Sequence, residues 1–193
     1  MNLHEEISHR LQAHIETAHK IAGIIEPVTQ AVEEVVQTFR SGGKILLAGN
    51  GGSAADAQHW AAEWVIRLSH TLERPAMPAI ALSTDTSVLT AGGNDIGFQN
   101  IFARQIEALA KTGDLFIAIS TSGNSENLLI ASGKAKEKGV RVLGILGKDG
   151  GKLRPLCNLF ILIPSNDTQR IQEMQEFIGH LLCELSELML FGV

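Results

Sequence analysis

The stretch DLFIAISTSGNS, from Asp114 to Ser125, joins an unbroken apolar run to a loop that is crowded with hydroxyl groups. The run has the length of a buried strand, and residues 126–138 are predicted to form a helix with Ser125 as its N-cap. A helix N-terminus has unpaired N–H groups and a partial positive charge, so this order of strand, loop and helix indicates a phosphate site. It is also typical of a polar turn that binds nothing. The loop matches neither a P-loop nor a GxGxxG pattern, which favours a small phosphorylated metabolite over a nucleotide.

Further apolar segments of strand length alternate with helical patterns along the chain. In addition to the run that starts at Asp114, the expected strands cover residues 44–49, 77–82, 141–146 and 158–163. The expected helices cover about residues 2–25, 27–41, 53–68, 84–90, 98–111, 126–138 and 167–190. Strands without alternating polarity that are separated by helices indicate a parallel sheet covered on both faces. The prediction is one domain over 1–193, an α/β three-layer α/β/α sandwich with a five-stranded parallel sheet and an added N-terminal helical segment of about 1–41.

Some local features of this pattern are also predictions. The glycine-rich segment AGGNDIGF, residues 91–98, is expected to be a turn between two helices. The helix after it is expected to face the core with Phe98, Ile101, Phe102, Ile106 and Leu109. Histidines recur near the N-terminus at steps of five residues, which turn about 140° on a helix and so cannot converge on one ion. We expect these histidines to be solvated; they are His4, His9, His14 and His19.

Composition excludes several classes of protein. The 193 residues are 45% hydrophobic and 19% charged, which suits one domain with a full core. The net charge of −5 gives no basic surface for nucleic acid or an anionic membrane. Cys157 and Cys183 form no CxxC pattern and are expected to be buried, reduced thiols. The charged N-terminus does not suit a signal peptide, and no apolar run reaches the ~20 residues of a membrane span, so a cytoplasmic protein is expected.

Two polar loops follow predicted strands at the same edge of the sheet. One runs from Asn50 to Ser53 after the first strand, and the other is the STSGNS loop after the third strand. Ligands of open parallel sheets bind outside the carboxyl ends of the strands, where the connections diverge. We therefore expect the two loops to face a common cleft.

Four polar side chains on two predicted helices have spacings that suit a metal site. His59 and Glu63 are four residues apart, and Gln172 and His180 are eight apart, which is about 80° of rotation. Two imidazoles, a carboxylate and an amide oxygen suit zinc, nickel or iron. Each pair alone is also typical of an exposed hydrogen bond on a helix. His180 lies in an apolar run, which predicts that it is buried and has a polar partner.

Several motifs together resemble one known family. The segments GNGGSAADAQHWAAE, GND, AISTSGNS, GKDGG and RIQEMQEFIGH are similar to those of the sugar isomerase (SIS) domain family, and within it to the phosphoheptose isomerases. The resemblance extends from about Ala31 to Val193 without a large gap, and the N-terminal helices also fit it. It implies the flavodoxin-like sandwich of SIS domains.

The resemblance also implies roles for individual residues. The phosphate cradle would be Ser120, Thr121, Ser122 and Ser125, and the sugar chain would contact Asn50, Gly51, Gly52, Asn94 and Asp95. Ser53 and Arg67 would line or support the site. One metal ion per subunit, usually zinc, would be held by His59, Glu63, Gln172 and His180, of which Glu63 and Gln172 also contact the substrate. Glu63 and His180 would form the acid and base pair. Gln169 departs from relatives that have an aspartate there, which puts one hydroxyl contact in doubt.

The implied reaction is the interconversion of sedoheptulose 7-phosphate and D-glycero-D-manno-heptose 7-phosphate through an enediol, the first step toward nucleotide-activated heptose. The family is tetrameric with active sites at subunit boundaries, which would account for the apolar terminal helices. One alternative is a DiaA-like protein that associates with a replication initiator, a non-catalytic tetramer that lacks the glutamate and the second histidine. Another is the sugar-phosphate-sensing SIS module of a regulator, for which the chain has neither a further domain nor a basic helix.

Overall fold

One parallel sheet organises the molecule. The computed structural model describes residues 1–192, and Val193, the last residue of the expected domain, lies outside them. The strands lie in the order β2-β1-β3-β4-β5, and all of them are parallel. Their bounds are Ile45–Ala48 (β1), Ala79–Ala81 (β2), Leu115–Ser120 (β3), Arg141–Leu146 (β4) and Leu159–Leu162 (β5). The predicted five-stranded parallel sheet is confirmed. Strand β2 is added on one side of β1, and β3, β4 and β5 are added on the other side. The position between β1 and β3, where the order of addition changes side, is the reversal point of the sheet.

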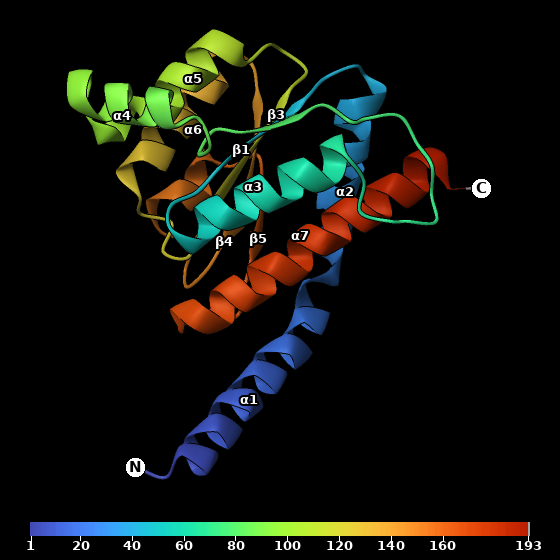
Figure 1. Ribbon diagram of the computed structural model, residues 1–193, viewed down its shortest axis with the longest axis vertical. Helices are drawn as coiled ribbons and strands as arrows, with labels where there is room; N and C mark the ends of the chain where they lie inside the picture. Colours follow the sequence, from blue (N-terminus) through green and yellow to red (C-terminus); the bar gives the residue numbers. More distant parts are fainter. Residues whose placement is uncertain (193) are drawn as a thin grey trace.

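Helices cover both faces of this sheet, so the three-layer sandwich is also confirmed. In Figure 1, α2, α3 and α7 lie over one face, α5 and α6 lie over the other, and α1 extends away from the body. The α-helices are Leu3–Lys20 (α1), Ile25–Arg40 (α2), Gly52–Val65 (α3), Thr86–Asp95 (α4), Ile101–Leu109 (α5), Glu126–Glu137 (α6) and Thr168–Phe191 (α7). Short 3₁₀ turns cover Ile21–Ile24 (η1), Phe98–Asn100 (η2) and Gly151–Leu156 (η3). No helix among residues 1–192 is long and apolar enough to cross a bilayer.

Successive strand residues supply two separate cores. In β1, Leu47 packs beneath α2, α3 and α7, whereas Leu46 packs beneath α5 and α6. All six residues of β3 are buried, because helices lie over both of its faces. Fully burying a large aliphatic side chain contributes roughly 1.5–3 kcal/mol, so the central strands hold the helix layers in place.

Two local predictions around the glycine-rich segment were wrong. Much of this segment lies inside α4, which Asp85 caps by accepting a hydrogen bond at Oδ1 from the Val88 N–H at 3.0 Å. Gly92 lets α4 approach α5, since a Cβ there would lie 3.1 Å from the Ile101 side chain. Phe98 is 59% exposed because it lies in a 3₁₀ turn before α5, and Leu109 at the end of α5 is also exposed.

The N-terminal helix contacts the body near its C-terminal end. Thr17 of α1 is buried, and the Nδ1 atom of His14 lies 2.8 Å from Oε2 of Glu173 on α7. His14 is therefore an exception to the prediction of solvated histidines.

The two cysteines differ in burial. Cys183 is buried as predicted, whereas Cys157 is only partly buried, and burial raises the pKa of Cys157 to about 12.

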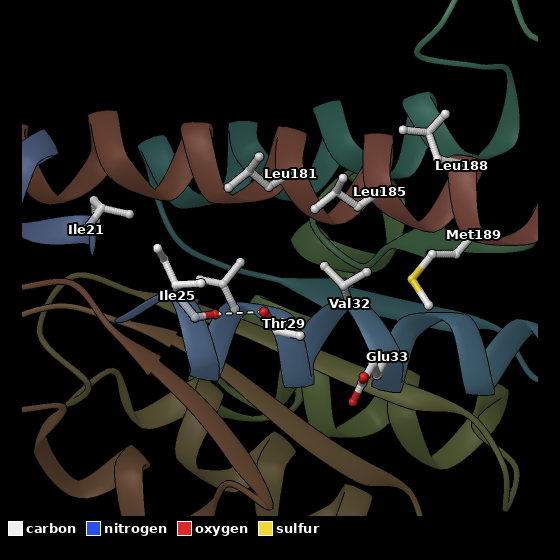
Figure 2. Close-up of a pocket in the computed structure, with 10 residues that line it drawn as sticks. Ile21, Ile25, Thr29, Val32, Glu33, Leu181, Leu185, Leu188 and Met189 are labelled. Carbon is white, nitrogen blue, oxygen red and sulfur yellow. Dashed lines mark hydrogen bonds between the residues drawn. The ribbon is translucent and has the colours of Figure 1, made fainter. Parts of the chain in front are cut away.

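An apolar groove of about 510 Å³ runs between α2 and α7. Figure 2 shows side chains from both helices pointing into it, among them Ile25 and Val32 from α2 and Leu181 and Leu185 from α7. Ile25 and Leu188 at its margins are more than half exposed. This groove has the chemistry of a protein contact and not of a sugar site.

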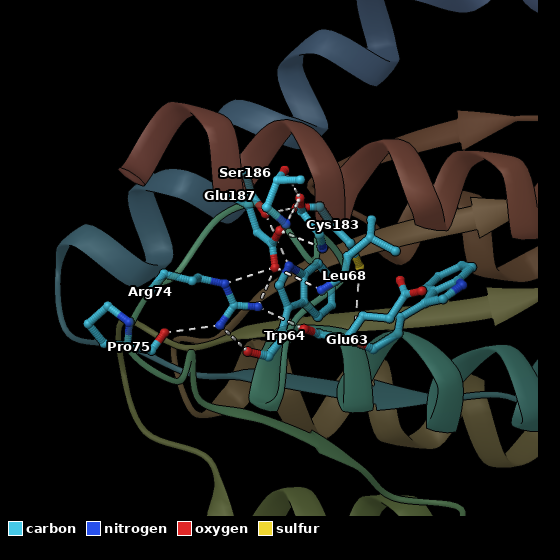
Figure 3. A network of polar contacts seen from close by, with 11 residues as sticks. Glu63, Trp64, Leu68, Arg74, Pro75, Cys183, Ser186 and Glu187 are labelled. Carbon is cyan, nitrogen blue, oxygen red and sulfur yellow. Dashed lines mark hydrogen bonds and ion pairs between the residues drawn. The ribbon is translucent and has the colours of Figure 1, made fainter. Parts of the chain in front are cut away.

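A buried ion pair joins the loop after α3 to α7. The Arg74 guanidinium and the Glu187 carboxylate contact each other, with side chains 0% and 2% exposed. Arg74 also donates to the carbonyl oxygens of Glu63 and Trp64, at 2.7 and 2.8 Å, and Trp64 Nε1 donates to Ser186 Oγ at 3.1 Å (Figure 3). The network therefore holds the C-terminal end of α3 against α7.

Replacing Arg74 with Met should destabilise the fold by about 3–5 kcal/mol, because it leaves the buried Glu187 carboxylate without a cation and with only the backbone N–H groups of Leu68 and Ser69 as partners. The matched control is Arg104→Met, which breaks an ion pair whose side chains are 69% and 53% exposed and should cost about 1 kcal/mol or less. Urea unfolding at one fixed protein concentration measures both. Similar small losses for the two variants would contradict this account.

Candidate active site

The loop after β1 places its polar groups at the reversal point of the sheet. Gly51 has φ +57°, a backbone conformation that favours glycine, and α3 begins at the next residue. The side chains of Asn50 and Asn127 exchange two hydrogen bonds, of 3.0 and 2.8 Å, and Asn127 lies in the first turn of α6. This pair confirms that the loops after β1 and β3 lie side by side.

The STSGNS loop after β3 is folded by its own hydroxyl groups. Ser120 Oγ accepts from the Gly123 N–H at 3.0 Å, and Ser122 Oγ accepts from the Asn124 N–H at 3.2 Å. A Cβ on Gly123 would lie 1.9 Å from the Gly150 carbonyl oxygen, so glycine is needed for the contact with the GKDGG loop. Ser125 occupies the N-cap position of α6 as predicted, but its side chain makes no capping hydrogen bond.

Three of the predicted metal ligands converge across α3 and α7. Glu63 Oε1 lies 3.1 Å from His59 Nε2 and 3.4 Å from His180 Nε2, and the two imidazole rings are perpendicular with centroids 5.2 Å apart. One donor atom from each residue lies within 4.8 Å of the others. The three residues can therefore hold one metal ion.

Glu63 and His180 differ in how far their side chains are exposed to solvent. Glu63 is buried, and its second oxygen, Oε2, has no hydrogen-bond partner. The His180 side chain is 42% exposed, so the prediction that it is buried was wrong. The apolar run around it belongs partly to the exposed side of α7, since Phe177 is 46% exposed. A buried carboxylate beside two imidazoles is the donor set of a divalent cation such as zinc.

The other predicted residues lie around this cluster or apart from it. Gln172 packs against the start of α3, where a Cβ on Gly52 would lie 2.2 Å from its Nε2 atom, and its role as a ligand stays a prediction. Ser53 is buried and donates to Gln175 Oε1 at 3.2 Å, which makes its hydroxyl a support between α3 and α7. Asn94 and Asp95 are exposed at the end of α4, and Arg67 is exposed beyond α3.

Sequence reasoning missed two carboxylates at this site. Glu176 Oε1 lies 2.6 Å from His59 Nδ1 and 3.2 Å from His180 Nε2, and Glu176 Oε2 accepts from Trp60 Nε1 at 3.2 Å. Asp56 lies next to Glu176. Helical spacing could have found both, because Asp56 precedes His59 by three residues and Glu176 precedes His180 by four.

The acidity of Asp56 is perturbed by its surroundings. Its pKa is raised from 3.8 to about 7, mainly by burial and also by the neighbouring Glu176 carboxylate, while His59 opposes the shift. Its Oδ2 atom is buried without a hydrogen-bond partner.

This shift predicts a pH-dependent effect of Asp56→Asn. A folded-state pKa above the unfolded value means that wild-type stability decreases as the pH rises from about 4 to about 7, whereas asparagine does not titrate. The variant should therefore gain stability relative to the wild type between pH 5 and pH 8. Urea unfolding of the metal-free proteins at both pH values measures this difference, and a difference that stays constant or shrinks would rule out the shift.

Comparisons with known proteins agree with the fold and the motifs. A family model described as "SIS domain" matches residues 5–147. Phosphoheptose isomerases from Geobacter sp. and Trichlorobacter lovleyi are 53% and 51% identical to this chain, over 97% of it in both cases and over 97% and 95% of the relatives. The matched segment of the family model contains His59 and Glu63, whereas α7 with His180 lies beyond it.

Solved structures give the same result. A phosphoheptose isomerase from Francisella tularensis superimposes with a TM-score of 0.93 at 34% identity, covering 97% of this chain and 99% of that chain. The phosphoheptose isomerase GmhA from Neisseria gonorrhoeae gives a TM-score of 0.89 at 39% identity, covering 96% and 98%. The chain therefore belongs to the SIS domain family and, within it, to the phosphoheptose isomerases.

Proposed function

We propose that this chain interconverts sedoheptulose 7-phosphate and D-glycero-D-manno-heptose 7-phosphate through an enediol intermediate. The observation that supports this most directly is the Glu63 carboxylate, which faces two imidazoles with Oε1 and leaves Oε2 buried and unpartnered. An aldose–ketose isomerase must move a proton between two adjacent carbons and a second proton between their oxygens. Glu63 and His180 are an acid and base pair within reach of each other for these two tasks.

Glu63 and His180 divide the proton transfers in this proposal. Glu63 takes the proton from C1 of the ketose and returns it at C2. His180 serves the sugar oxygens, because its side chain is 42% exposed and so is open to a bound substrate. The exchanged assignment, with His180 at the carbons and Glu63 at the oxygens, is the alternative.

A divalent cation, which we propose is Zn²⁺ at one per subunit, would be held by His59, Glu63 and His180, with Gln172 as a fourth ligand. When bound, it would supply Lewis-acid polarisation of the two sugar oxygens and stabilise the enediolate charge. Within the chain itself, Oε1 of Glu63 is the oxygen turned toward both imidazoles.

The phosphate and the sugar chain would bind along the two loops at the reversal point of the sheet. Ser120, Thr121, Ser122 and Ser125 lie before the N-terminus of α6, where the helix dipole attracts an anion. Ser125 has a free hydroxyl for this purpose, because it makes no capping bond. Asn50, Gly51 and Gly52 would contact the sugar chain together with Asn94 and Asp95, and Ser53 would support it. Binding of the remote phosphate positions the reacting carbons.

A non-catalytic, initiator-associating protein is the alternative from another class. It is not favoured, because relatives over nearly the whole length of the chain are phosphoheptose isomerases. The carboxylate and the second imidazole that such a protein would lack are both present and in contact here.

We also propose that the chain works in the cytoplasm as a single domain within a homotetramer whose active sites lie at subunit boundaries. Two features support assembly: the apolar groove between α2 and α7, and the apolar face of α1, where Leu3, Ile7 and Leu11 are 58–63% exposed. An unpartnered apolar surface of this kind marks a protein contact. The exposed Arg67 beyond α3 would then reach a neighbouring subunit's site.

Replacing Glu63 with Gln should lower kcat by about 10²- to 10⁴-fold, because the amide cannot accept the proton. Turnover of sedoheptulose 7-phosphate by the zinc-loaded proteins measures the loss, with circular dichroism to confirm that both are folded. The matched control is Glu137→Gln, an exposed change at the end of α6, which should keep wild-type turnover. A Glu63→Gln enzyme with full activity would exclude this residue as the base.

Replacing Leu188 with Glu should reduce the molecular mass in solution below that of a tetramer, because it places a charge at the margin of the apolar groove. Light scattering coupled to gel filtration measures the mass. Leu109→Glu is the matched control, an equally polar change on the opposite face of the sheet, and it should remain tetrameric. A wild-type protein that is monomeric at micromolar concentration would refute the assembly.

A further inference from the structure

Glu176 contacts the one nitrogen of His59 that does not face Glu63. The distances are 2.6 Å from His59 Nδ1 to Glu176 Oε1 and 3.1 Å from His59 Nε2 to Glu63 Oε1. The imidazole therefore lies between two carboxylates, one on α7 and one on its own helix. Its two nitrogens have different tasks, and Glu176 determines which nitrogen has which task.

We propose that Glu176 is a positioning residue for the cation site, which it serves by accepting the Nδ1–H of His59 and so leaving the Nε2 lone pair toward the cation. This inference rests on the cation site of the proposed function. A neutral imidazole has one N–H and one lone pair, and a carboxylate acceptor draws the N–H to its own side. A carboxylate behind a histidine ligand also fixes the orientation of the ring and increases its basicity as a ligand.

The position of Glu176 is itself fixed from the other side. Trp60 is fully buried and its Nε1 donates to Glu176 Oε2 at 3.2 Å, so each carboxylate oxygen has a defined partner. The indole has room there only because residue 179 is glycine, since a Cβ on Gly179 would lie 1.9 Å from Trp60 Cε2. The contact between Trp60 and Gly179 therefore places the donor that holds Glu176.

Glu176 lies on the wrong side of His59 to share a cation with it as a direct ligand. The three donor atoms that come within 4.8 Å of one another belong to His59, Glu63 and His180. Glu176 Oε1 does lie 3.2 Å from His180 Nε2, a contact between residues four apart on α7.

The test is zinc affinity, which is measured on metal-free protein by competition with a chelator of known affinity. Glu176→Gln should weaken zinc binding about 10- to 100-fold, the usual loss when a carboxylate behind a histidine ligand is removed. The matched control is Glu184→Gln on the exposed side of the same helix, which should bind zinc as the wild type does. An unchanged zinc affinity in Glu176→Gln would overturn the inference.

Two further measurements separate positioning from direct ligation. Trp60→Phe removes the N–H that holds Glu176 together with part of the indole ring, and should weaken zinc binding in the same direction by a smaller factor. The absorption spectrum of the cobalt-loaded Glu176→Gln protein should keep the wild-type band positions at saturation, because no ligand is lost. A spectrum that reports a changed coordination number would instead make Glu176 a direct ligand and overturn the inference.

Failure of the inference can be distinguished from failure of the proposed reaction. A wild-type protein that binds zinc, with weaker binding in Glu176→Gln, supports the inference even if sedoheptulose 7-phosphate is not converted. A wild-type protein that binds no zinc overturns the inference, whatever its turnover. Circular dichroism and urea unfolding of each variant establish that the affinities refer to folded protein.

Discussion

The packing of α3 against α7 is the constraint on which the site depends. The candidate acid and base lie on these two helices, which are more than a hundred residues apart in the sequence, and Glu63 Oε1 and His180 Nε2 meet at 3.4 Å. At one end of the contact the buried pair of Arg74 and Glu187 ties the end of α3 to α7, and near the middle Trp60 packs onto the bare backbone of Gly179. The geometry of the candidate site is thus set by contacts between the two helices that lie outside the His59, Glu63 and His180 cluster.

The sheet places the second half of the site. Its reversal point between β1 and β3 brings two loops together, and the paired amides of Asn50 and Asn127 join them. The glycines in these loops permit close backbone approaches that a side chain would block, as at Gly123. One edge of the sheet therefore brings the two polar loops together, while the α3–α7 contact brings together His59, Glu63 and His180.

Much of this architecture could be predicted from residue patterns. Unbroken apolar strands between helices predicted the sheet, and helical spacing predicted that His59 and Glu63 share a face. The errors arose where tertiary contacts override local periodicity: Asp85 extends a helix through a glycine-rich segment, and His180 is half-exposed within an apolar run. Glu176 lies four residues before His180, a spacing that was overlooked, whereas its contacts with His59 and Trp60 on α3 depend on the tertiary fold.

The central claim is that Glu63 and His180 exchange protons with a bound sugar phosphate next to a divalent cation. Its most direct test is turnover of sedoheptulose 7-phosphate in deuterated water, by protein stripped with a chelator and then reloaded with zinc. The account predicts an aldose product that has gained deuterium at C2, formed by the reloaded enzyme and lost on stripping. Product that forms without solvent deuterium would contradict proton transfer through an exchangeable enzyme base. No turnover from a folded, zinc-loaded protein would contradict the isomerase function itself.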